Sequence, residues 1–217
     1  ESDLKNSNTN EGQVAAFTVL GRIFNNSGWT YWSYWAHEFG HTIGLAHVGS
    51  SRTQGPFHPM DMMGNQNGTT RELSGWLRFI VGWMPDEKVF CKNLENLSNL
   101  SIDLIPLNSK DQGFKMVVIR LSATKALIIE SRRYTEFACR KDKTDNGVLA
   151  YIYDGNLNHA EEFLQPIIPI NRPIKSVGCA VSPYANPIFT SGEEVEYEGI
   201  KIRVSSSSNL DRIEIKR

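Results

Sequence analysis

The feature that most constrains this chain of 217 residues is the segment from His37 to His47. It reads His-Glu-Phe-Gly-His-Thr-Ile-Gly-Leu-Ala-His, the pattern H-E-x-x-H-x-x-G-x-x-H, and it contains three of the five histidines. His37 and His41 are four positions apart, so on a helix they lie one turn apart on the same face. That spacing lets two imidazoles reach one tetrahedral zinc ion. The sequence therefore predicts a metal-binding helix over residues 29–44.

The other positions of the pattern each have a task at such a site. Gly44 tolerates the positive φ with which a helix ends and the chain turns back sharply. His47 then supplies a third nitrogen, and three protein ligands leave a fourth position open for water, as in catalytic zinc sites. Glu38 is placed to take a proton from a zinc-bound water. We therefore predict one catalytic zinc ion bound by His37, His41 and His47, with Glu38 as the general base.

These residues resemble the active-site segment of the metzincin metallopeptidases. That family also has a Met-turn, a loop whose methionine lies under the zinc-binding histidines, and residues 59–64, Pro-Met-Asp-Met-Met-Gly, resemble it. The family pattern fits Asp61-Met62-Met63, which makes Met63 the expected Met-turn methionine and Met62 the second choice. The alternative interpretation is a loop in which methionines fill gaps in the core. The resemblance implies a zinc-dependent endopeptidase that acts on a protein or peptide substrate.

A wider resemblance covers about residues 29–154. Asp-x-Met-Gly, followed by a helix that ends at residues 81–83, is similar to the gametolysin and immune inhibitor A families. Residues 129–132 and 147–154 resemble the β-rich part of immune inhibitor A-like proteases. His47 fits the gametolysin pattern better than the immune inhibitor A pattern.

Two departures from the metzincin pattern bear on the fold. Metzincin catalytic domains usually place several strands and a helix before the active-site helix, but 36 residues precede His37. We therefore expect the upper half of the usual catalytic domain to be missing, or to be supplied by an N-terminal segment or a partner chain. Some metzincins also have a tyrosine two residues after the Met-turn methionine. Residue 65 is asparagine, which leaves that substrate-polarising role unfilled.

Before residue 90 the sequence predicts helices and loops. Residues 1–12 are polar and are expected to form a loose end. Thr69 followed by Glu72 has the pattern of a capping box, which would start a helix that ends at Pro85. That helix would carry an apolar stripe of Leu73, Trp76, Leu77, Ile80 and Trp83. A cluster of aromatic residues, at positions 29–35, is expected to pack the start of the active-site helix.

After residue 90 the pattern changes to short apolar runs separated by polar turns, which predicts strands. The predicted strands are residues 101–106, 114–121, 126–131, 147–153, 194–198, 201–204 and 212–216. The fold class is therefore α+β, with a zincin-like helix and Met-turn followed by an antiparallel, sandwich-like β-rich region. We divide the chain into a zinc-binding subdomain, residues 1–90, and the β-rich region, residues 91–217.

Composition excludes several other classes of function. Lys and Arg total 23 and Asp and Glu total 24, and a net charge of −1 gives no basic field for nucleic acid. The longest apolar runs, at residues 79–84 and 116–119, are far shorter than the roughly 20 residues of a membrane-spanning helix. Sequons at Asn25, Asn67, Asn96 and Asn99 indicate a secreted glycoprotein.

The remaining candidate residues carry weaker signals. Cys91, Cys139 and Cys179 contain no C-x-x-C pair, which argues against a cysteine metal site, and one disulfide with any of three pairings stays open. His58 and His159 are expected to be ordinary loop and surface histidines. The acidic stretch at residues 193–198 is expected to be a charged strand face, with a calcium site as the alternative.

The function predicted from the sequence is a secreted zinc metalloendopeptidase. The alternative is a structural or adhesive extracellular protein that keeps a metzincin-like zinc site without using it. Glu38 favours the enzyme, because a zinc site with a purely structural role has no need of that carboxylate.

Overall fold

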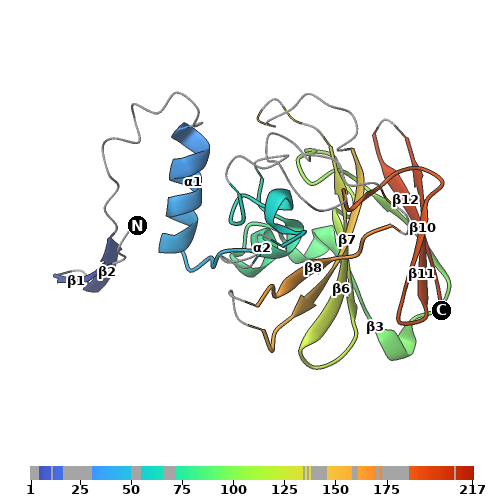
Figure 1. Ribbon diagram of the computed structural model, residues 1–217, viewed down its shortest axis with the longest axis horizontal. Coiled ribbons are helices and arrows are strands. Elements are labelled where there is room, and N and C mark those ends of the chain that lie inside the picture. Colours follow the sequence, from blue (N-terminus) through green and yellow to red (C-terminus); the bar gives the residue numbers. More distant parts are fainter. Residues whose placement is uncertain are drawn as a thin grey trace.

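The fold is mixed α+β, with one helix that carries the His37/His41 spacing followed by mostly antiparallel β-sheets (Figure 1). The computed structural model describes residues 5–10, 12–16, 31–49, 55–65, 72–133, 135, 137, 146–157, 161–169, 172, 186–207 and 209–217. At this level the α+β class predicted from the sequence is confirmed. No helix in the described part of the chain is long and apolar enough to cross a membrane.

The helices are short and lie in the first half of the chain. The predicted active-site helix is α1, Tyr31–Thr42, and a second α-helix is α2, Gly75–Ile80. Three single-turn 3₁₀ helices complete the set within the described residues: η2 (His58–Met60), η3 (Asp86–Lys88) and η4 (Leu94–Asn96).

Helix α2 begins at a different residue from the one that the sequence predicted. Its N-cap is Ser74, whose hydroxyl accepts a hydrogen bond from the backbone N–H of Leu77. Thr69, the predicted cap, lies outside the described residues. The first N–H groups of α2 are satisfied by carboxylates that lie far away in the sequence. The predicted apolar stripe is also only half right, because Leu77 is buried whereas Ile80 and Trp83 are more than half exposed.

Most strands belong to two sheets. The larger sheet has the order β3-β5-β6-β7-β8, with β9 also paired to β7, and the smaller has the order β10-β11-β12-β4. The strands of the larger sheet are β3 (Val89–Asn93), β5 (Met116–Arg120), β6 (Lys125–Arg132), β7 (Gly147–Asp154), β8 (Leu164–Pro166) and β9 (Ile188–Phe189). Those of the smaller sheet are β4 (Leu100–Leu104), β10 (Glu194–Tyr197), β11 (Ile200–Ser206) and β12 (Asp211–Lys216). All neighbouring strands are antiparallel except β3 and β5, a parallel pair that the sequence did not predict.

The larger sheet is covered on both faces. One face packs against the smaller sheet around a buried cluster that includes Leu127, Ile129, Ile202 and Ile213. The other face packs against the segments that carry α2 and the predicted Met-turn, around a second cluster with members on both sides of residue 90. Because both faces are covered, β6 and β7 are buried at nearly every position and not at alternate ones. The layers follow one another across Figure 1, from α1 through α2 to the two sheets.

Two other predictions concern residues that the structure describes. The predicted loose end contains a two-stranded antiparallel hairpin, β1 (Lys5–Thr9) and β2 (Gly12–Ala16), so that expectation was wrong. The boundary near residue 90 falls at the start of β3, and the division into a zinc-binding subdomain and a β-rich region stays a prediction.

An ion pair across β4 and β12 gives a test of the sheet register. Asp103 and Arg212 are direct cross-strand partners, and both carboxylate oxygens accept from the guanidinium, at 2.7 and 2.8 Å. The hydrogen bond from Arg212 lowers the pKa of Asp103. A lowered folded-state pKa contributes stability above the unfolded pKa that is lost as the pH falls through the folded pKa.

We expect Arg212→Ala to return the pKa of Asp103 towards its ordinary value and to remove this small acid-sensitive contribution. An NMR titration of the Asp103 carboxyl measures the change, with Arg203→Ala, an exposed arginine on β11, as the control. An Asp103 pKa that is the same in wild type and Arg212→Ala would contradict the pairing.

Candidate metal centre

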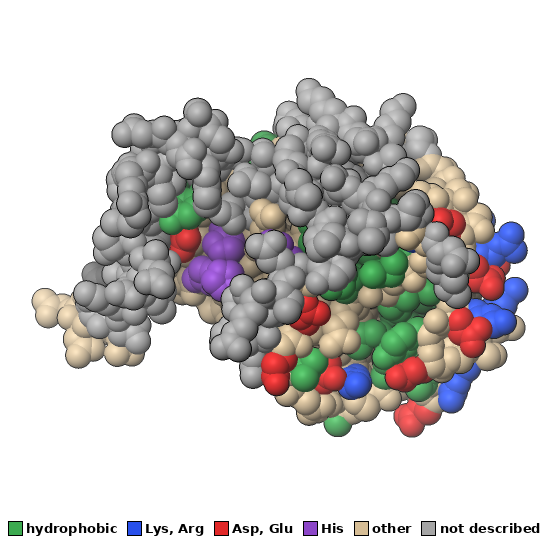
Figure 2. Space-filling model, in the orientation of Figure 1, with side chains coloured by type: hydrophobic (Ala, Val, Ile, Leu, Met, Phe, Trp, Pro, Cys, Tyr) green, Lys and Arg blue, Asp and Glu red, His purple; other side chains and the backbone are tan. Residues whose placement is uncertain are grey.

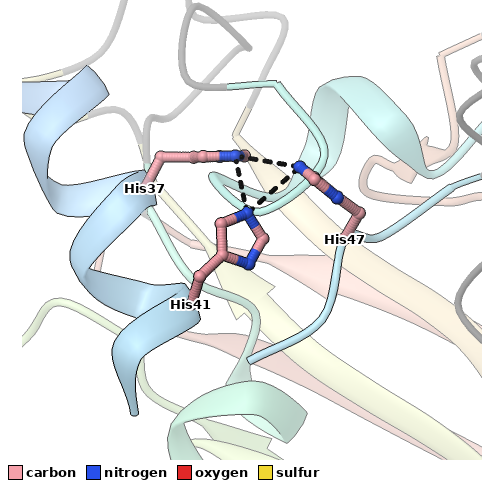
Figure 3. A group of neighbouring side chains, drawn as sticks. All are labelled: His37, His41 and His47. Carbon is pink, nitrogen blue, oxygen red and sulfur yellow. Dashed lines mark hydrogen bonds between the residues drawn. The ribbon is translucent and has the colours of Figure 1, made fainter. Parts of the chain in front are cut away.

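Helix α1 brings two of the predicted ligands to one face. His37 and His41 lie one turn apart, and their side chains project from the same side of the helix towards the loop that follows it (Figure 3). His37 is 5% exposed, His41 is half-buried and His47 is exposed, so the group reaches from the interior to solvent. Figure 2 shows histidine side chains gathered at the surface of one face, beside an acidic side chain.

The turn after α1 brings the third predicted ligand back. The N–H of Leu45 donates to the carbonyl of Gly40 at 3.0 Å, and the N–H of Gly44 donates to that of His41 at 3.1 Å. These two bonds form a Schellman motif with Gly44, at φ +92°, in the left-handed position that favours glycine. The role predicted for Gly44 is therefore confirmed, and His47 follows three residues later on the returning chain.

The three histidines present their Nε2 atoms to one another. The Nε2 atom of His37 lies 3.2 Å from those of both His41 and His47, and the last two are 3.1 Å apart (Figure 3). Tetrahedral zinc holds nitrogen ligands at about 2.0–2.1 Å, which places two of them about 3.3 Å apart. The spacing of the three nitrogens fits that geometry closely. Within the described residues, these histidines form the one group of His, Cys, Asp or Glu side chains that could hold a metal ion.

Backbone carbonyls fix the tautomer of two of these rings. Nδ1 of His37 lies 2.7 Å from the carbonyl oxygen of Met62, and Nδ1 of His41 lies 2.8 Å from that of Leu45. A carbonyl only accepts, so each Nδ1 carries the proton, and in the neutral ring Nε2 is left as an acceptor. Burial lowers the pKa of His37, which favours that neutral form. Two acceptor lone pairs that face each other at 3.2 Å are stabilised by a shared cation.

The predicted Met-turn lies directly under this arrangement. Met63 is fully buried and packs against α1 at Gly40, where an added Cβ would lie 2.5 Å from the Met63 sulfur. The backbone N–H of Val48 donates to the carbonyl of Met63 at 3.1 Å, which joins the turn to the chain just after His47. Met62, the second choice, contributes its carbonyl to His37. The role of Met63 as the floor of a zinc site stays a prediction.

Glu38 lies on α1 and is 9% exposed. Its carboxylate accepts a hydrogen bond from the hydroxyl of Tyr34, one helical turn earlier. Burial of the phenol, and to a smaller extent this carboxylate, raise the pKa of Tyr34. Tyr34 was not predicted as a partner of Glu38. Their spacing of four residues places the two side chains one turn apart on the same face of a helix, and this spacing could have indicated the contact. The catalytic role of Glu38 itself is not tested by this geometry.

The other candidate residues predicted from the sequence do not belong to this three-histidine group. His58 is half-buried beside the Met-turn, and burial is the main cause of its lowered pKa, but it is not a member of the three-histidine group. Glu193 binds Arg172, and the acidic stretch around it forms no metal-binding group within the described residues. Cys91 is a free, exposed thiol on β3. His159, Cys139 and Cys179 lie outside the described residues.

Comparisons with known proteins found no match to this chain. No family model matches the chain, and no curated protein or solved structure matches it. The resemblance to metzincins therefore depends on the sequence motifs of this chain alone.

The metal centre itself can be tested by ligand removal. We expect the protein to bind one Zn²⁺ or Co²⁺ per chain, and His47→Ala to weaken that binding by more than the roughly 10–100-fold that follows loss of a group hydrogen-bonded to a ligand. Isothermal titration with Zn²⁺ and the absorption spectrum of the Co²⁺ form measure this. His58→Ala is the matched control, because His58 is a nearby histidine outside the group. Equal affinities in the two variants would refute the assignment.

The contact between α1 and the Met-turn can be tested at Gly40. We expect Gly40→Ala to displace the Met63 side chain, to destabilise the fold by about 1–3 kcal/mol and to weaken zinc binding. Met63→Ala alone removes buried volume and should destabilise by about 2–5 kcal/mol. Thermal unfolding of both variants and of the double variant completes the cycle. A double variant that loses the full sum of the two single losses would show that the two sites do not touch.

Proposed function

We propose that this protein is a zinc-dependent metalloendopeptidase. The observation that carries the proposal is the convergence of three histidine Nε2 atoms at 3.1–3.2 Å, with the His37 and His41 rings oriented by backbone carbonyls. Glu38 follows directly after the first of these histidines, on the same helix. Three nitrogen ligands and a nearby carboxylate are the parts that metal-assisted hydrolysis requires.

Each residue has a proposed task. His37, His41 and His47 hold the zinc ion, and the hydrogen bonds from Nδ1 of His37 and His41 keep those two rings in the ligating tautomer. When bound with three protein ligands, zinc supplies a Lewis acid and a water of lowered pKa. Met63 closes the site from below with an apolar side chain.

Glu38 is the proposed general acid–base. Its carboxylate accepts a proton from the attacking water and later returns the proton to the leaving amine. The hydroxyl of Tyr34, one helical turn earlier, donates a hydrogen bond to that carboxylate. The burial of Glu38 strengthens its electrostatic interactions with neighbouring groups.

The proposed substrate is a protein or peptide, and the proposed location is extracellular. Metzincin-like sites act on peptide bonds, which is the reason for the substrate class. Two of the four sequons, at Asn96 and Asn99, lie on exposed residues, as a glycosylated asparagine requires.

Replacement of Glu38 separates catalysis from metal binding. We expect Glu38→Gln to lower cleavage of casein by about 10²–10⁴-fold, the usual contribution of general acid–base catalysis, while zinc content stays at one ion per chain. A chelator should abolish the wild-type activity, and added zinc should restore it. Glu87→Gln, an exposed glutamate on η3, is the control and should be fully active.

Two results would decide against this function. Full activity in Glu38→Gln would remove Glu38 from the mechanism. A wild-type protein that binds zinc and cleaves nothing would favour the structural or adhesive alternative.

A further inference from the structure

A polar cluster of Glu130, Arg132 and Tyr151 is buried in the larger sheet, on the face that packs against the Met-turn. Glu130 and Tyr151 are fully buried, and Arg132 is 2% exposed. Their neighbours on this face, Met116 and Ile128, are apolar and fully buried. A buried ion pair can often be replaced by apolar side chains without loss of stability. Packing alone therefore does not explain why this face carries a carboxylate, a guanidinium and a phenol.

Glu130 holds the first residue of α2. One carboxylate oxygen, Oε2, accepts from the backbone N–H of Gly75 and from the hydroxyl of Tyr151, both at 2.7 Å. The other, Oε1, accepts from Nε of Arg132 at 2.6 Å. A Cβ at position 75 would lie 2.7 Å from Oε2 and 3.0 Å from the sulfur of Met116, so only glycine leaves room for this approach. The start of α2 is thereby fixed relative to β6 and β7.

The start of α2 in turn holds the Met-turn through a second buried carboxylate, Asp61. Its Oδ2 accepts from the backbone N–H of Ser74 at 2.6 Å, and its Oδ1 accepts from that of Met63 at 2.7 Å. The backbone N–H of Met62 also donates to the carbonyl of Glu72, at 2.9 Å. The Met-turn therefore cannot shift relative to α2 without breaking several buried hydrogen bonds.

The last link is the hydrogen bond from Nδ1 of His37 to the carbonyl of Met62, at 2.7 Å. We propose that Glu130 is a positioning residue of the three-histidine centre: it fixes the start of α2, which holds Asp61 and the Met-turn, whose Met62 carbonyl orients His37. The larger sheet then helps to orient the His37 ring at the metal centre. This inference depends on the proposed metal-binding role of the histidines and not on peptide hydrolysis.

Two variants at this cluster test the proposal. Glu130→Gln removes the charge and replaces one acceptor by a donor, and Tyr151→Phe removes a single hydroxyl at nearly constant volume. Ile128→Val is the matched control, because Ile128 is buried on the same strand and the same face but takes no part in the chain of hydrogen bonds. All three are measured at a temperature at which circular dichroism shows them to be folded, so that a loss of global stability alone does not change the result.

Two measurements are made on each variant. The first is the Zn²⁺ dissociation constant, which we expect to rise about tenfold in Glu130→Gln, near the lower end of the effect of losing a group that orients a ligand, and less in Tyr151→Phe. The second is the ¹⁵N NMR spectrum of the His37 ring without metal. It should show a proton on Nδ1 in wild type and Ile128→Val, and a growing share of the Nε2-protonated form in the other two variants.

The outcomes separate this proposal from the metal site itself. Zinc affinity and His37 tautomer that match Ile128→Val in both variants would overturn the positioning role. If Glu130→Gln does not fold, Tyr151→Phe decides alone. If wild type binds no zinc, the metal centre is wrong, and an unchanged tautomer then overturns the positioning role as well, whereas a changed one supports it.

Discussion

The hydrogen bond from Nδ1 of His37 to the carbonyl oxygen of Met62 is the interaction on which the arrangement of the three histidines depends. It is buried and short, so water does not compete for either partner. It determines which nitrogen of His37 carries the proton, and it joins α1 to a loop 25 residues later in the chain. The opposite tautomer would place a proton between the three Nε2 atoms and leave a buried carbonyl without its donor, at a cost of about 1–3 kcal/mol.

Close packing around this bond requires small residues at particular places. Gly40 lets Met63 approach α1, and Gly64 lies against the carbonyls of His58 and Val48, where a side chain would collide with backbone. Gly44 has a different reason, since nothing lies within 4 Å of its missing Cβ and its positive φ alone requires glycine. The site therefore combines one conformational glycine with glycines that are needed for space.

Sequence reasoning succeeded where the relevant contacts are local. The spacing of His37 and His41 and the turn at Gly44 are set within a few residues, and the positions of most strands follow from short apolar runs. It failed where distant segments decide the outcome. Helix α2 begins just after its N-cap, Ser74, where Asp61 and Glu130 accept from the first N–H groups. No local pattern shows carboxylates that lie 13 and 55 residues away. The parallel pairing of β3 with β5 is likewise a property of the assembled sheet.

Contacts with distant segments also attach α1 to the rest of the molecule. Its large exposed side chains, Trp32, Trp35 and Phe39, lie on the side of the helix away from the histidines. On that side Trp32 packs edge-on against Phe137, with ring centroids 5.6 Å apart. On its histidine side, α1 contacts the Met-turn at Gly40 and His37. An ion shared by His37, His41 and His47 would add a further link, between the helix and the chain beyond its turn. A ligand that binds only the folded arrangement stabilises that arrangement. The stabilisation grows with the logarithm of the ratio of ligand concentration to dissociation constant. Binding of such an ion and the docking of α1 would therefore be thermodynamically coupled, and each would strengthen the other through the same carbonyl of Met62.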